Sequence, residues 1–151
     1  MKSQNGFTLI ELMITVFILA ILASVAYPSY LQYLTRNNRS AAESYMLTVA
    51  NKEEQYALDV RQYFSVPTIS VNCSNPLAGV PLTSIGITPP ANVGKNYNID
   101  ICANSAATPP TYTITATPIG NQLTADTLCG VISLKQDATK TSGPSPVTAC
   151  W

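Results

Sequence analysis

The 151-residue sequence has no histidine and few charged residues of either sign. Histidine is the usual general base near neutral pH and the commonest metal ligand, so its absence counts against hydrolytic and metal-dependent catalysis. Only 11% of the residues are charged, with eight basic and eight acidic side chains. This balance gives no support for strong attraction to phosphate or anionic lipid. Serine and threonine are plentiful but have no identifiable activating base, so we expect no enzyme, no metal site and no cofactor.

Cysteine is absent from the first 72 residues and occurs four times after them, at Cys73, Cys102, Cys129 and Cys150. No CxxC pair suggests zinc or redox chemistry, and an even number after an apolar segment predicts disulfides in an oxidising compartment. Four cysteines permit three pairings. Sequential pairing closes two modest loops without crossing the chain, which favours Cys73 with Cys102 and Cys129 with Cys150. The other pairings remain open.

The apolar residues are concentrated in the segment 7–27, in which Glu11 is the only charged residue. As a helix this segment would be about 32 Å long, which matches the hydrocarbon thickness of a bilayer. Lys2 precedes it, and no other basic residue follows until Arg36, which is a weak signal for a cytoplasmic N-terminus. The bulk of the chain would then lie on the outer side of the membrane.

Two ordinary interpretations of this segment are a cleaved secretory signal, with residues 24–26 (Ser-Val-Ala) as the cleavage site, and a simple single-pass anchor. The length of the apolar run and the thin basic region argue against a cleaved signal. Glu11 argues against both, because a carboxylate inside a bilayer is costly and is by default functional, with a partner.

The segment 6–12 reads Gly-Phe-Thr-Leu-Ile-Glu-Leu and resembles the processing motif of type IV pilins. The resemblance implies that a membrane peptidase cuts after Gly6, that the new amine of Phe7 is methylated, and that the apolar helix is retained. It also implies that Glu11 is required for assembly. In a filament, the Glu11 carboxylate can meet the Phe7 amine of a neighbouring subunit in a water-poor core, which neutralises both charges.

The helical pattern continues beyond the apolar segment through Pro28 to about Leu58. The resemblance implies that the helix melts locally at Pro28 when subunits pack, whereas propensity alone leaves a helix boundary there open. From residue 31 onward the pattern is amphipathic, with a predicted apolar stripe of Leu31, Leu34, Ala41, Tyr45, Val49 and Tyr56. The opposite face is expected to be solvated and includes Glu53 with its neighbour Glu54. Arg36 and Arg39 are expected near the lipid headgroups.

Two further segments resemble the PilE group of minor pilins. Residues 56–63 place a tyrosine, an aspartate, an arginine and a second tyrosine at the spacing that closes the long helix in that group. The chain end, with Cys129 before an alternating strand and a terminal Cys150 and Trp151, is also similar.

The remainder predicts a sheet. Residues 67–90 are rich in turn formers and read as a long loop, and period-two patterns predict strands at 97–101, 112–117 and 131–134. The tail from Gln136 is judged too polar to extend the sheet. We therefore expect an α+β type IV pilin fold. Its long N-terminal helix, with a protruding apolar half, packs on a three- to four-stranded antiparallel sheet with a disulfide-stapled C-terminal loop.

The expected organisation is a leader (1–6), a transmembrane and filament-core helix (7–27), an amphipathic helix on the sheet (28–58) and a globular domain (59–151). The resemblance implies a structural, minor subunit of a type IV pilus, acting in adhesion, twitching motility and DNA uptake. Its partners would be other pilin subunits, the prepilin peptidase, the assembly machinery and, before assembly, the inner membrane, with the C-terminal domain in the periplasm. The assembled pilus would be extracellular.

Three alternatives remain: a major pilin, a DNA-receptor pilin and a type II secretion pseudopilin. DNA binding has weak support from charge, because Arg61, Lys95, Lys135 and Lys140 are scattered through the globular part. The cysteines and the Cys150-Trp151 ending disfavour the pseudopilin.

Overall fold

The computed structural model describes residues 7–64, 86–104 and 107–151. The chain separates into two compact units, residues 1–34 and 35–151, which are described separately. A single helix, α1 (Leu9–Val60), contributes residues to both units.

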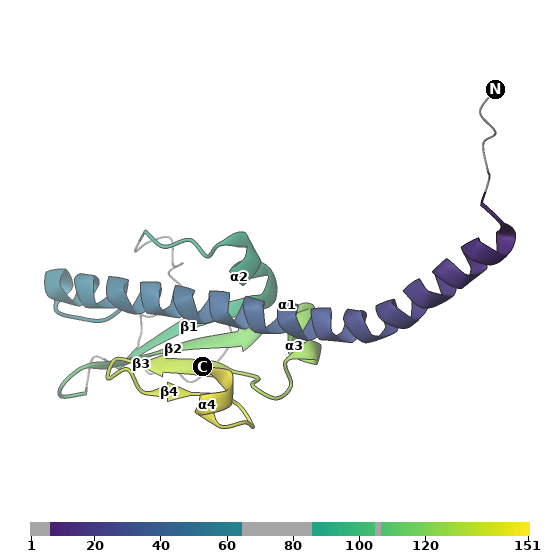
Figure 1. Ribbon diagram of the computed structural model, residues 1–151. Helices are drawn as coiled ribbons and strands as arrows, with labels where there is room; N and C mark the ends of the chain where they lie inside the picture. Colours follow the sequence, from purple (N-terminus) through teal and green to yellow (C-terminus); the bar gives the residue numbers. More distant parts are fainter. Residues whose placement is uncertain (1–6, 65–85, 105–106) are drawn as a thin grey trace. The chain divides into compact units, whose positions relative to one another are not determined.

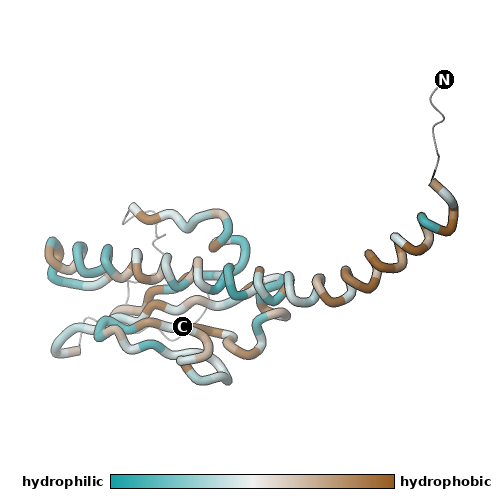
Figure 2. The backbone as a smooth tube through the Cα atoms, viewed as in Figure 1, coloured by the Kyte–Doolittle hydropathy of each residue, from teal (hydrophilic) through white to brown (hydrophobic). Residues whose placement is uncertain are grey.

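In the first unit, every described side chain from Phe7 to Tyr33 is exposed. Pro28 lies inside α1, so the helix does not end there, as propensity alone had allowed. Helix α1 is long and apolar enough to cross a membrane, with a mean hydropathy of 2.6 in its most apolar 18-residue window, near the N-terminus. Figure 2 shows this apolar stretch as a nearly continuous brown segment of the tube.

The second unit contains a four-stranded antiparallel sheet in the order β1 (Tyr97–Asn104), β2 (Thr111–Pro118), β3 (Ile132–Lys135) and β4 (Lys140–Thr141). Three short helices accompany it: α2 (Ala91–Asn96), α3 (Gly120–Ala125) and α4 (Val147–Cys150). Strands β1 and β2 pair over eight residues, with Ile101 opposite Ile114, and β3 places Leu134 opposite the same Ile114. The register brings the apolar side chains of three strands onto one face.

That face is covered by the second half of α1, which runs across the sheet in Figure 1. In β2 every second residue is buried, as expected for a sheet with one solvated face. The shared core is apolar and nearly solvent-free; its helix members are Ala42, Tyr45, Met46 and Val49, and its strand members include Ile99, Ile101, Ile114, Ala116, Ile132 and Leu134. The predicted α+β fold, the four-stranded sheet and the disulfide-stapled C-terminal loop are all present.

The face of α1 that packs on the sheet differs from the predicted stripe. Tyr45 and Val49 are buried as expected, but Leu31 is exposed, and Ala42 and Met46 complete the buried face. Glu53 was expected to be solvated, and this was wrong: its side chain is fully buried. The helical spacing from Ala42 through Tyr45 and Val49 continues to Glu53, so periodicity outweighs charge at this position.

The prediction that the tail is too polar to join the sheet was also wrong, because β4 pairs with β3 through Leu134 and Lys140. A two-residue edge strand needs only backbone hydrogen bonds and tolerates polar side chains on both faces. The loop predicted at 67–90 falls largely outside the described residues.

Candidate functional site

The N-terminal turn of α1 is closed by a reciprocal pair of side chains, Thr8 and Glu11. The backbone N–H and the hydroxyl of Thr8 both donate to Oε2 of Glu11, at 2.9 and 2.8 Å. In return the backbone N–H of Glu11 donates to the Thr8 hydroxyl at 3.3 Å. This is a capping box, and the spacing Thr-x-x-Glu is its sequence signature, which the sequence analysis overlooked. In a single chain Glu11 is therefore satisfied locally.

The other residues predicted for processing and assembly lie on the same exposed segment. Phe7 immediately precedes this capped turn and is 83% exposed. Pro28 lies within the helix, and Gly6 lies outside the described residues. The pairing of Glu11 with the amine of a second subunit remains a prediction.

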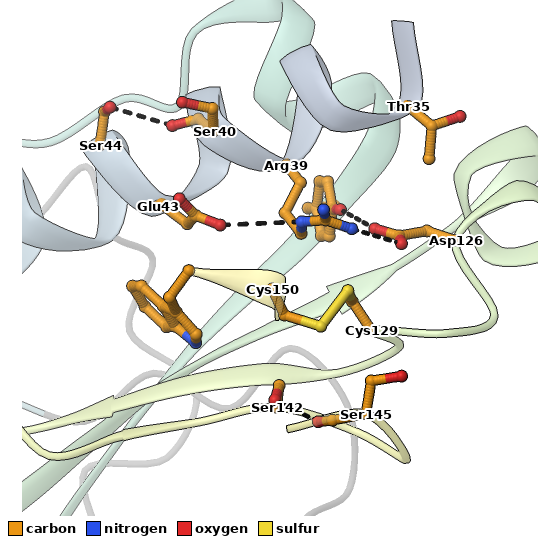
Figure 3. Close-up of polar contacts among 12 residues, drawn as sticks. Thr35, Arg39, Ser40, Glu43, Ser44, Asp126, Cys129, Ser142, Ser145 and Cys150 are labelled. Carbon is orange, nitrogen blue, oxygen red and sulfur yellow. Dashed lines mark hydrogen bonds and ion pairs between the residues drawn. A yellow bond between two sulfur atoms is a disulfide. The ribbon is translucent and has the colours of Figure 1, made fainter. Parts of the chain in front are cut away.

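A buried polar network joins α1 to the segment that follows β2. Arg39 donates to Oδ1 of Asp126 at 2.6 Å, and a weaker contact of 3.8 Å joins it to Glu43 (Figure 3). Both partners of the short ion pair are largely buried, with 11% and 4% of their side chains exposed. Arg39 is therefore held within the second unit by Asp126, and its expected place near the lipid headgroups remains a prediction.

Gln122 on α3 completes the network. Its amide nitrogen, which carries two N–H donors, lies within hydrogen-bond distance of three acceptors: the Thr35 carbonyl at 3.0 Å, the Tyr97 hydroxyl at 2.9 Å and Asp126 at 3.2 Å. The Tyr97 hydroxyl donates to Asp126 at 3.2 Å. Burial in this setting, together with the nearby Asp126 carboxylate, raises the pKa of Tyr97. Sequence reasoning did not identify α3 or Gln122, since a short polar helix gives no periodic signal.

The C-terminal loop is fastened at both of its ends. The disulfide between Cys129 and Cys150 joins the turn before β3 to α4 (Figure 3). The N–H of Gly143 donates to the Cys129 carbonyl at 2.7 Å. At the chain end, the indole Nε1 of Trp151 donates to the Thr141 carbonyl on β4 at 3.0 Å. The tail is thus tied to the sheet by covalent and polar contacts.

The second expected disulfide is only partly visible. Cys102 on β1 is disulfide-bonded, and no described cysteine is free. Cys73 lies outside the described residues, so its pairing with Cys102 remains a prediction.

The β3–β4 hairpin carries two lysines, and one of them contacts the aromatic ring of Trp151. Lys135 and Lys140 flank its turn, and both are exposed. The ammonium of Lys140 lies 4.7 Å from the centre of the Trp151 ring, a cation–π distance. Acidic groups reduce the positive charge of this surface, because Asp137 lies in the turn and Glu43 on α1 interacts with Lys140. Desolvation raises the pKa of Glu43 against the opposing effects of Arg39 and Lys140.

Within the described ranges, no cluster of three or more potential metal-ligating side chains is found.

Comparison with known proteins gives matches along most of the chain. A family model described as "Type IV minor pilin ComP, DNA uptake sequence receptor" matches residues 28–133. A model of the prokaryotic N-terminal methylation motif matches residues 1–27.

Individual relatives are similar over different lengths. Fimbrial protein Q of Moraxella bovis is 30% identical over 139 residues, which is 91% of this chain and 83% of that protein. A fimbrial protein of Pseudomonas aeruginosa is 41% identical over 68 residues, 45% of this chain and 44% of that protein, so that match spans less than half of the relative. Among solved structures, a type IV pilin from Shewanella oneidensis has 16% identity and a TM-score of 0.48, covering 78% of this chain and 97% of that chain.

Proposed function

We propose, from the premise that this chain belongs to the type IV pilin family, that it is a minor structural subunit of a type IV pilus. The observation that carries this is the first half of α1, an apolar helix whose described side chains are all exposed in the single chain. In water such a surface is strongly unfavourable, so it must be covered by lipid or by other helices. The membrane lipid covers this surface before assembly, and the helices of other subunits cover it in the pilus core.

Glu11 gives this helix a specific partner. In the single chain its carboxylate is held by Thr8, which supplies two hydrogen bonds but no charge. The amine of Phe7 on an incoming or neighbouring subunit would supply that charge, and a neutral pair is far less costly in an apolar core than an unpaired carboxylate. We propose that this exchange of partners accompanies assembly.

The methylation-motif match over residues 1–27 supports the proposed processing: cleavage after Gly6 by the prepilin peptidase and methylation of the amine of Phe7. The proposed organisation is a leader (1–6), a core helix (7–27), a packed helix (28–58) and a globular domain (59–151). Before assembly the protein spans the inner membrane once, with residues 59–151 in the periplasm, and afterwards it lies in an extracellular filament. Adhesion and twitching motility follow from membership of such a fibre.

Substitution of Glu11 tests the filament role. A Glu11→Gln subunit keeps the length of the side chain and an acceptor for Thr8 but cannot pair with an amine. We expect it to be cleaved and retained in the membrane at wild-type levels, while its copy number in sheared filaments falls at least tenfold. A matched Asp59→Asn variant, which removes an exposed acid from the other end of α1, controls for the loss of one negative charge. Normal incorporation of Glu11→Gln would overturn the proposal.

DNA is the second proposed partner, and the family match over residues 28–133 favours it. Charge alone argues against DNA binding, because the basic residues are few. The structure nevertheless places one of them, Lys140 on β4, against the indole of Trp151. Lysines that neutralise phosphates and an aromatic ring that contacts a base or sugar are the two ordinary components of such a surface. We propose the hairpin as the contact with DNA taken up by the fibre.

The DNA proposal is tested by titrating a fluorescent duplex with the full chain in detergent micelles at several salt concentrations. Lys140→Gln should weaken binding several-fold and reduce the slope of log K against log salt by about 1. Lys52→Gln, which removes an exposed lysine from α1, should leave both unchanged. Equal effects of the two substitutions, or no retention of DNA at low salt, would contradict this interface.

A further inference from the structure

Glu53 is a fully buried carboxyl group that neither the filament nor the DNA proposal uses. It lies near the C-terminal end of α1, on the face that carries Tyr45 and Val49 into the core. Its Oε2 atom accepts the backbone N–H of Phe64 at 2.8 Å. Its Oε1 atom is buried and has no hydrogen-bond partner among the residues that the structure describes.

The bond to Phe64 folds the chain back onto the helix that it has just left. After α1 ends at Val60, Arg61 adopts a left-handed backbone conformation with φ of 60°. The returning segment then packs its two aromatic rings: Phe64 against Tyr56, with ring centres 5.6 Å apart, and Tyr63 against Tyr112 at 4.7 Å. The residues 61–64 are named here the return turn. Glu53 supplies its buried polar anchor.

Among the residues that the structure describes, no cation is found to offset the charge that Glu53 would carry when ionised. The groups that interact electrostatically with Glu53 are acidic or phenolic: Glu54 beside it on α1, Tyr63 in the return turn and Tyr112 on β2. Lys52, the adjacent basic residue on the helix, donates instead to Gln55. The sequence after the turn offers no substitute, because residues 65–85 contain no charged side chain.

We propose that Glu53 is a pH-sensitive latch, which holds the return turn against α1 while its carboxyl group is neutral and loosens the turn when it ionises. A neutral carboxyl can accept the Phe64 N–H at modest cost in an apolar core. An ionised one without a cation is driven towards water and must break its contact with the core to reach it.

The direction of the effect follows from the pKa. Desolvation raises the pKa of Glu53 from 4.5 to about 7, against the opposing effect of the Phe64 hydrogen bond. A group whose pKa is raised in the closed state stabilises that state at low pH, and this stabilisation is lost as the pH rises towards 7. With a pKa of about 7 in the closed turn and the ordinary 4.5 in the open turn, the equilibrium between them shifts towards the open turn by about 30-fold between pH 5.5 and 8.5.

The test uses hydrogen exchange and carboxyl titration by NMR on the full chain in detergent micelles. After correction for the intrinsic effect of pH, protection of the Phe64 amide should fall about 30-fold from pH 5.5 to 8.5 in the wild type. Glu53→Gln keeps an acceptor but cannot ionise, so its protection should change less than twofold. Asp59→Asn removes an exposed carboxyl from the same helix and should behave as the wild type.

The carbon-13 shift of the Glu53 carboxyl gives a readout that needs no variant. It should titrate near pH 7, together with the Phe64 amide. A Glu53 midpoint near 4.5, or wild-type and Glu53→Gln proteins with the same pH dependence at Phe64, would overturn the proposal.

Discussion

At Gly143 the C-terminal loop approaches the backbone of Cys129 closely. A Cβ atom built there would lie 2.7 Å from the carbonyl oxygen of Cys129, and this atom belongs to the backbone. The same oxygen accepts the Gly143 N–H, so the close approach and the hydrogen bond depend on each other. Any side chain at this position must push the loop away from Cys129.

We therefore expect Gly143→Ala to lower the free energy of unfolding by about 2 kcal/mol, because a backbone clash cannot be relieved by a rotamer change. Urea unfolding followed by Trp151 fluorescence measures this. Gly94→Ala is the matched control: its new Cβ would lie 3.9 Å from Pro89, an ordinary contact, within helix α2. That variant should be unchanged or up to about 1 kcal/mol more stable. Equal loss in both variants would contradict the argument.

The ion pair between Arg39 and Asp126 contributes to the position of α1 more than to net stability. It is largely buried, and such pairs give little net stability relative to apolar residues, although removal of one partner is costly. What the pair and Gln122 supply is placement, because their bonds reach α1 at Thr35 and Asn38 as well as at Arg39. They fix the first residues of α1 that belong to the second unit.

At the scale of elements, β4 depends on a disulfide more than on its own sequence. Two backbone pairings would not hold a strand that has both residues exposed. Cys129 and Cys150 close a loop of 21 residues around it, and Trp151 adds a bond to Thr141. The disulfide is thus the main constraint on the edge strand that carries Lys140.

Replacement of both Cys129 and Cys150 by serine should lower the free energy of unfolding by about 3 kcal/mol, the loop-entropy value for a loop of this length. It should also free Trp151, the only tryptophan, so that its fluorescence anisotropy falls before the sheet unfolds. Thr148→Ala, on exposed α4 surface inside the same loop, is the control. Unchanged stability together with unchanged anisotropy would show that the polar contacts alone hold the loop.

The elements that repeat a pattern were predictable, and those held by single contacts were not. Helix α1 and strands β1 to β3 follow from apolar periods of 3.6 and 2, and their predicted bounds differ from the observed ones by at most three residues. Helix α3 and strand β4 have no such period; they depend on the bonds of Gln122 and on the Cys129 disulfide. The burial of Glu53 was not predicted, although its position continues the helical period, because a charged residue is normally expected to face solvent.

The candidate sites show the same division. The processing motif and Glu11 are local in sequence, so they could be identified without a structure. The capping partner Thr8 was within reach of the same reasoning, because a Thr-x-x-Glu spacing predicts it. The contact between Lys140 and Trp151 required the structure, because no local motif in the sequence links these two residues.

For the whole molecule, the two units differ in what they need from their surroundings. The core of the second unit begins at Ala42 and is built from residues of that unit alone. Its polar anchor on α1 begins at Thr35, and its C-terminal disulfide closes within it. The first unit has no buried residue among those described, so it depends on lipid or on other subunits.

A chain that begins at Thr35 should therefore fold without detergent and remain monomeric in size-exclusion chromatography, because the exposed apolar helix has been removed and no core residue has been lost. Its free energy of unfolding in urea should stay within about 0.5 kcal/mol of that of the full chain in micelles, since surface changes away from the core have small effects. A chain that begins at Ser40 is the informative comparison: it lacks Asn38 and Arg39 and leaves Asp126 buried without its cation, which should cost about 3 kcal/mol or more. If the Thr35 chain aggregates or unfolds, the second unit draws stability from the apolar helix. If the Ser40 chain is equally stable, the Arg39 anchor has no energetic role.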